Sequence, residues 1–116
     1  MRVAIIGSRH FSALERVSEY VNGLPGGASI VTGGASGVDA AATKAARTRG
    51  LAVQVLPMSF EEVKDTARAE ERRSKLVDSC DVLVAFWDGA SPGTRTTVER
   101  ALDAGKEVHV FTSRLG

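Results

Sequence analysis

A glycine-rich segment carries the strongest indication of chemistry in this sequence. It follows an apolar run, ASIVT, and precedes an alanine-rich stretch, VDAAATKAARTR. Glycines let the backbone turn sharply and let a ligand approach its N–H groups, and a helix that starts there adds its positive dipole end. We therefore predict a phosphate-binding loop, with contacts from Gly33, Gly34, Ala35, Ser36, Gly37 and Asp39.

The same segment has a purely structural interpretation. Its spacing matches neither the dinucleotide pattern GxGxxG nor the Walker pattern GxxxxGK[ST]. Ser36 and Asp39 have the Ser-x-x-Asp spacing of a capping box, in which the hydroxyl accepts a hydrogen bond from a free backbone N–H at a helix start. Phosphate binding and helix capping both remain open for these two side chains.

Gly7, Ser8 and Arg9 form a second candidate, directly after the first apolar run. A serine hydroxyl can donate a hydrogen bond to an anion, and an arginine can hold one through two parallel hydrogen bonds. The alternative is a tight turn followed by a solvated arginine. Position at the end of a predicted strand is what favours a ligand role.

A third candidate is the segment DGASPGT, which follows the apolar run VLVAFW. Its glycine gives backbone access, and its threonine can cap a helix or bind a phosphate oxygen. We assign ligand contacts here to Ser91, Gly93 and Thr94. Nearby, Thr96 and Glu99 also fit a capping box, which would make Glu99 structural.

The elements that must position these loops alternate along the chain. Short apolar runs predict buried strands over residues 2–6, 28–32, 52–56, 82–87 and 107–111. Helical patterns predict a helix that starts near Ser12, where Ser12 and Glu15 suggest a capping box, and helices over 38–49, 60–77 and 97–104. Alternation of this kind is typical of an α/β protein with right-handed crossovers.

We therefore predict one Rossmann-like, three-layer α/β domain over residues 1–116, with a mainly parallel five-stranded sheet and helices on both faces. Ligands of such sheets bind beyond the carboxyl ends of the strands. All three glycine loops follow predicted strands, so we expect them to meet at one edge.

Composition narrows the class of function. The chain has 116 residues, 43% of them hydrophobic, and a net charge of +1, which argues against binding of nucleic acid through overall charge. Cys80 has no partner for a disulfide, and His10 and His109 lack metal-ligand spacing, so we expect no metal and no required cofactor. No segment is apolar over the roughly 20 residues that a membrane helix needs, and a cytoplasmic location follows as an expectation.

The order IIGSR, VTGGASGVDAAA and ERRSKLVDSCDVLVAFWDGASPGT resembles the SLOG superfamily of Rossmann-like nucleotide-binding proteins, in particular its small single-domain YspA/YpsA-like branch. Relatives include the LOG phosphoribohydrolases, which cleave a nucleoside monophosphate to free base and ribose 5-phosphate, and the DNA-processing protein A of natural transformation. The resemblance implies a nucleotide-type small-molecule ligand and, from the LOG relatives, a homodimer.

The LOG pattern can be compared position by position. Arg72 lies nine residues before Asp81, as the arginine of the LOG enzymes precedes the aspartate of their fourth strand. Their loop PGGxGTxxE carries an acidic residue that acts at the ribose, whereas this sequence has Thr97 there and Glu99 two residues later. The resemblance thus implies Arg72 and Glu99 as candidate catalytic residues.

Three functional hypotheses follow. The first is a module that binds a nucleotide or nucleotide-derived phosphate ligand at the glycine loops. The second is a LOG-type nucleoside 5'-monophosphate phosphoribohydrolase, an N-glycosidic hydrolase. The third is a DNA-processing accessory module, which the nearly neutral charge disfavours because strong backbone binding needs a clustered basic surface.

Overall fold

Among the residues that the structure describes, the sheet has five strands, as the sequence predicts, and each boundary lies within one residue of its predicted position. The computed structural model describes residues 1–8, 10–56 and 66–112. Its strands are β1 (Arg2–Gly7), β2 (Ser29–Thr32), β3 (Ala52–Val55), β4 (Val82–Trp87) and β5 (Glu107–Thr112). The prediction of buried strands holds for β1, β2 and β4 in the middle of the sheet. It is wrong for β3 and β5, which are edge strands without a fully buried residue, because an edge strand has a neighbour on one side only.

All neighbouring strands are parallel, in the order β3-β2-β1-β4-β5. The chain therefore builds the sheet outward from β1 in one direction and then outward from β4 in the other. The two directions separate between β1 and β4, where Gly7 pairs with Phe86. Such a switch point leaves a crevice at the carboxyl ends of the strands, the usual ligand position in this architecture.

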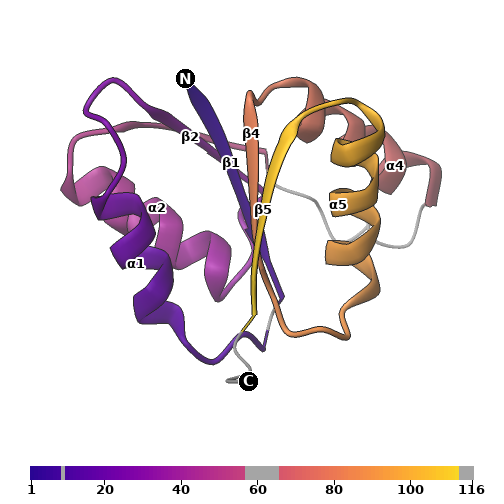
Figure 1. Ribbon diagram of the computed structural model, residues 1–116, viewed down its shortest axis with the longest axis horizontal. Helices are drawn as coiled ribbons and strands as arrows, with labels where there is room; N and C mark the ends of the chain where they lie inside the picture. Colours follow the sequence, from indigo (N-terminus) through magenta and orange to yellow (C-terminus); the bar gives the residue numbers. More distant parts are fainter. Residues whose placement is uncertain (9, 57–65, 113–116) are drawn as a thin grey trace.

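Helices cover both faces of the sheet, which confirms the three-layer prediction. The helices are α1 (Leu14–Asn22), α2 (Val38–Thr48), α4 (Thr66–Asp78) and α5 (Pro92–Asp103). Figure 1 shows α1 and α2 on one side of the sheet, and α4 and α5 on the other. The sheet and these two helix pairs form two separate hydrophobic interfaces.

Alternation along the strands divides the core between these interfaces. Val3 and Ile5 of β1 belong to the cluster beneath α1 and α2, whereas Ala4 and Ile6 belong to the cluster beneath α4 and α5. Cys80, 2% exposed, packs in the second cluster and is a core residue. Since successive side chains of a strand point to opposite faces, the fully apolar sequence of β1 is what a central strand of a three-layer domain requires.

The start of α1 differs from the prediction. The capping box of Ser12 and Glu15 is wrong, because the helix begins at Leu14 and Ala13 is its N-cap, with no side-chain capping bond. Phe11 explains the delay: it is buried, its N–H donates to Ser8 O at 3.2 Å, and its ring packs against another core ring. The residues before α1 therefore form a turn that places Phe11 in the core, and the helix begins only after this turn.

The start of α5 also differs, by five residues. The helix begins at Pro92 rather than Thr97, after Ser91 in an extended conformation. Proline suits the first position of a helix because its missing N–H would have no intrahelical partner there. The Thr96–Glu99 capping box is consequently wrong, since Thr96 lies inside the helix and donates its hydroxyl to Pro92 O at 2.9 Å.

The two remaining helices follow the sequence pattern more closely. For α2, the predicted range 38–49 exceeds the observed one by a single residue. For the third predicted helix, 60–77, the described part is α4, which ends at Asp78. The predicted positions 60–65 lie outside the described residues.

The crowded position of Gly7 generates a stability prediction. A Cβ there would lie 2.4 Å from Val38 Cγ2 and 2.7 Å from Phe86 O, so both α2 and β4 would have to shift. We expect Gly7→Ala to lower the free energy of unfolding by about 1–3 kcal/mol, the usual cost of overpacking. Urea unfolding measures this.

Gly26→Ala is the matched control, because a Cβ at Gly26 would meet nothing within 4 Å. The control should change stability by less than about 1 kcal/mol. Equal stability of Gly7→Ala and the wild type would show that the close approach of β1 to α2 is not a constraint.

Candidate functional site

A cavity of about 380 Å³ opens at the carboxyl ends of β1 and β2, where residues of α4 and α5 close its other side. It brings together eight of the residues predicted from sequence. They are Gly7, Gly33, Gly34, Ala35, Asp39, Arg72, Gly93 and Thr94. The expectation that the glycine loops meet at one edge of the sheet is therefore met by the geometry, at the switch point of the fold.

The loop between β2 and α2 depends on glycine in its backbone. Gly34 and Gly37 both have φ of +80°, a conformation that other residues rarely adopt. Gly33 lies against the carboxylate of Asp39, since a Cβ at Gly33 would be 3.0 Å from Asp39 Oδ2. The loop therefore wraps closely around this carboxylate.

Asp39 is buried at the floor of the cavity, with 6% of the residue exposed. Burial raises the pKa of Asp39 to about 6, although the hydrogen bond from the Ala35 N–H acts in the opposite direction. The Thr32 hydroxyl also favours the ionised form. Within the described residues, however, neither Thr32 Oγ1 nor Asp39 Oδ1 has a hydrogen-bond partner of ordinary geometry.

The predicted capping box at Ser36 and Asp39 is corrected by this arrangement. Gly37 is the N-cap of α2 and has no side chain with which to cap it. The Asp39 carboxylate reaches back as a capping-box carboxylate would, but it accepts from the N–H of Ala35, at 3.0 Å, rather than from the N-cap residue. The first turn of α2 therefore has no side-chain cap from its N-cap residue.

Two arginines of α4, Arg72 and Arg73, line the cavity opposite the glycine loop. The guanidinium of Arg73 comes close to the first turn of α5, because a Cβ at Gly93 would be 3.5 Å from Arg73 Nη2. A positive charge and a helix N-terminus thus face the same space. Both favour an anion.

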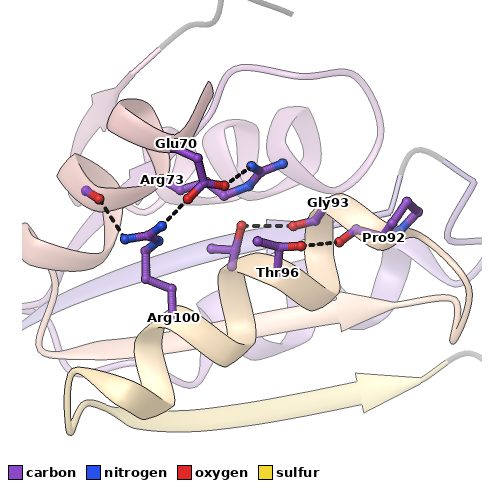
Figure 2. A network of polar contacts seen from close by, with 8 residues as sticks. Glu70, Arg73, Pro92, Gly93, Thr96 and Arg100 are labelled. Atoms are coloured by element: carbon purple, nitrogen blue, oxygen red, sulfur yellow. Dashed lines mark hydrogen bonds and ion pairs between the residues drawn. The ribbon is translucent and has the colours of Figure 1, made fainter. Parts of the chain in front are cut away.

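Side-chain hydrogen bonds hold the first turn of α5. Thr97 donates its hydroxyl to Gly93 O at 3.0 Å, and Thr96 donates to Pro92 O at 2.9 Å. Figure 2 shows both bonds along the first turn of the helix. Because Gly93 and Thr94 lie in this turn, the backbone that faces the cavity has a defined position.

Ser8 and Ser91 do not line the cavity. Their hydroxyls instead form hydrogen bonds with Asp88, in the loop after β4. The Ser8 hydroxyl accepts a hydrogen bond from the N–H of Asp88 at 3.0 Å, which ties the end of β1 to the end of β4. The Ser91 hydroxyl donates to Asp88 Oδ2. The N–H groups of Ala90 and Ser91 lower the pKa of Asp88 to about 2, so this carboxylate is ionised and fully engaged.

The other predicted residues lie away from the cavity or outside the described part of the chain. Ser36 is exposed on the loop, and Gly37 serves as the N-cap of α2. Glu99 forms an exposed ion pair with Arg95 at 2.9 Å and lines a different groove, between α4 and α5. Arg9 is not among the described residues. The structure therefore unites Arg72, but not Glu99, with the glycine loops.

Five lining residues received no ligand role from the sequence: Ile6, Leu56, Arg73, Leu76 and Thr97. The adjacent arginines Arg72 and Arg73 look alike in sequence, and only the orientation of α4 shows that both reach the cavity. The apolar residues resemble ordinary core positions. Ile6 and Leu56 could have been found only from their place at or near strand ends, whereas Leu76 lies within α4.

The described residues show neither a cluster of metal-ligating side chains nor a membrane-spanning helix. Within residues 1–8, 10–56 and 66–112, no three His, Cys, Asp or Glu side chains gather as metal ligands would. No helix in the same ranges is both long enough and apolar enough to cross a membrane. The homodimer and the cytoplasmic location stay predictions.

Comparison with protein families gives a match over residues 1–101 to the family described as DNA recombination-mediator protein A. The chain belongs to this family. The match also confirms the resemblance to the SLOG superfamily, of which the DNA-processing proteins are members. Among curated proteins, none matches the sequence significantly.

A solved structure shares the fold. The X-ray structure of DNA processing protein A (DprA) from Streptococcus pneumoniae matches with a TM-score of 0.81 at 21% identity. The match covers 94% of this chain and 49% of that one, so this chain spans about half the length of the DprA chain. At this identity the likeness establishes the Rossmann-like fold.

The raised pKa of Asp39 predicts how stability depends on pH. The folded protein binds this proton more tightly than the unfolded chain, whose carboxyl has a pKa near 3.8. The associated stabilisation is fully present below pH 3.8 and is lost as pH rises through about 6. Asp39→Asn removes the titrating group, so the variant gains stability relative to wild type between these pH values, by about 3 kcal/mol in total.

Urea unfolding of both proteins between pH 4 and pH 8 measures the difference. Taking the difference cancels other groups, such as Asp88, whose lowered pKa acts in the opposite direction. A difference that does not vary with pH would contradict the assigned environment of Asp39.

Proposed function

We propose that the cavity binds a nucleotide or a nucleotide-derived phosphate ligand. The observation that carries this proposal is the convergence, at one switch point, of the β2–α2 glycine loop, the first turn of α5 and two arginines of α4. Helix starts and glycine-rich turns offer backbone N–H groups to an anion, and guanidinium groups offer paired donors.

The phosphate end of the ligand fits best between α4 and α5. Arg72 and Arg73 supply positive charge there, while Gly93 and Thr94 supply backbone N–H groups and a hydroxyl from the first turn of α5. The dipole of α5 adds to the attraction, since its positive end lies at Pro92.

The rest of the ligand would lie toward β1 and β2. Ile6, Leu56 and Leu76 offer apolar surface for a sugar or base, and Asp39 is the carboxylate on this side of the cavity. The buried Asp39 Oδ1 has no hydrogen-bond partner of ordinary geometry among the described residues, which supports a site that accepts a polar ligand. The volume of about 380 Å³ also suits a ligand of this size.

Titration calorimetry with adenosine 5'-monophosphate and inorganic pyrophosphate tests the proposal. We expect Arg72→Gln to weaken binding by roughly tenfold, as loss of a charge-assisted hydrogen bond does. Lys75→Gln is the control, because Lys75 is exposed on the same helix and does not line the cavity.

Absence of binding to any nucleoside phosphate, or equal weakening by both substitutions, would contradict the proposal. The same samples separate binding from hydrolysis. Release of free base that depends on Arg72 would indicate the LOG-type phosphoribohydrolase, whereas an intact ligand indicates a binding module. The position of Glu99, outside the cavity, favours the binding module.

Family membership favours a second candidate, a module that takes part in DNA processing. The chain covers about half of the DprA chain, so a role in DNA processing has to be tested on this chain directly. A gel-shift titration on single-stranded DNA at two salt concentrations provides that test. Binding that falls steeply with salt supports this candidate, and no shift at low salt excludes direct DNA binding.

A further inference from the structure

Glu70 of α4 lies between two arginines, one of which lines the cavity. Arg73 Nη1 donates to Glu70 Oε1 at 2.8 Å, and Arg100 of α5 donates through Nη2 to Glu70 Oε2. Figure 2 shows the carboxylate with one guanidinium on each side, and Arg100 also donates to the Ser74 hydroxyl at 3.0 Å. The cluster thus joins α4 to α5 behind the phosphate end of the cavity.

The charges in this cluster do not cancel. Two guanidinium groups face one carboxylate, which leaves one unit of positive charge. Of the three residues, only Arg73 lines the cavity. The side chains are between 24% and 38% exposed, so solvent screens them less than it screens fully exposed pairs.

The ionised state of Glu70 is well supported. Partial desolvation raises its pKa, but the hydrogen bond from Arg73 and the charge of Arg100 outweigh this, so the pKa of Glu70 lies below its usual value. Glu70 therefore carries its charge at neutral pH, and both arginines interact with a carboxylate rather than with a carboxylic acid.

The geometry also orients Arg73. Its Nη1 is engaged by Glu70, whereas Nη2 is the atom that approaches Gly93 in the first turn of α5. A free arginine side chain samples many rotamers and loses that freedom when it binds an anion. An arginine whose side chain is already held by Glu70 loses less rotamer freedom when an anion binds, and this smaller entropic cost favours binding.

Packing alone does not account for Arg100. Its Nε is buried and, among the described residues, has no acceptor, an arrangement that reduces stability. A neutral residue at this position would avoid that cost. The contact that distinguishes Arg100 is its bond to Glu70.

We propose that Glu70 and Arg100 are positioning residues of the phosphate site: Glu70 holds Arg73 against the first turn of α5, and Arg100 balances the Glu70 charge so that the charge of Arg73 acts on the ligand. This inference rests on the proposed function. It assigns to Arg100, which does not touch the cavity, an effect on anion affinity.

The test compares Arg100→Gln with the double variant Glu70→Gln/Arg100→Gln, with adenosine 5'-monophosphate as the probe in calorimetry at low salt. Arg100→Gln leaves Glu70 to cancel Arg73, and we expect affinity to fall by roughly three- to tenfold, as for the loss of one nearby charge. The double variant should return to within about twofold of wild type, because the neutral amide still accepts from Arg73 but no longer cancels its charge.

Recovery in the double variant separates positioning from a merely structural role, since a structural role makes the double variant at least as weak as Arg100→Gln. If Arg100→Gln fails to fold, Arg100→Lys gives the second comparison: it keeps the charge and should bind like wild type. Arg95→Gln is the matched control, because Arg95 forms an ion pair with Glu99 on the same helix, away from the cavity.

Wild-type affinity in Arg100→Gln, a double variant no tighter than Arg100→Gln, or loss of binding in Arg100→Lys with its fold intact would overturn the inference while the proposed function stands. Failure of the wild type to bind any nucleoside phosphate or pyrophosphate would instead overturn the proposed function, and the inference with it.

Discussion

The close approach at Gly7 is the constraint on which the rest of the site depends. The end of β1 touches both Val38, the first residue of α2, and the backbone of β4, and leaves no room for a side chain. Because of this contact, the end of β1 lies directly between the β2–α2 loop and the end of β4. The cavity exists where these segments meet, on the face covered by α4 and α5.

Charge is distributed unevenly around that cavity. On the α4 side, Arg72 and Arg73 line the cavity, Arg73 lies close to the first turn of α5, and Arg100 forms an ion pair with Glu70. On the β2 side, Asp39 is buried with a raised pKa, at a cost in stability above pH 6. A protein retains such a cost most readily where the group serves a ligand, and perturbed carboxylates cluster at functional sites. The overall charge of +1 conceals this local separation.

The sequence was sufficient to predict the strands, the existence of the helices, and the edge of the sheet at which the glycine loops meet. Each strand was an apolar run ending near a turn residue, and the parallel order followed from strict alternation with helices, so the meeting of the glycine loops could be expected. Helix starts were less predictable. Ser12 and Thr96 both matched capping patterns, but the burial of Phe11 and the suitability of Pro92 for the first helical turn decided the boundaries instead.

The roles of individual side chains within the site could not be predicted from residue spacing, because they depend on hydrogen-bond partners and on how the helices pack. Ser8 and Ser91 resembled phosphate ligands in sequence, yet in the structure both are engaged with Asp88. Arg73 and Arg100, 27 positions apart, are joined only by the packing of α4 against α5 around Glu70. The family match and the DprA structure support the fold and the superfamily, whereas the ligand is inferred from the geometry of the cavity.

The most direct test of the central claim is a titration of the 15N-labelled protein with adenosine 5'-monophosphate, followed through backbone amide chemical shifts. The account predicts that the largest changes fall together on Gly33, Gly34, Gly93 and Thr94, which come from two loops separated by more than half the chain. Changes confined to other surfaces, such as the α4–α5 groove beside Glu99, would contradict it.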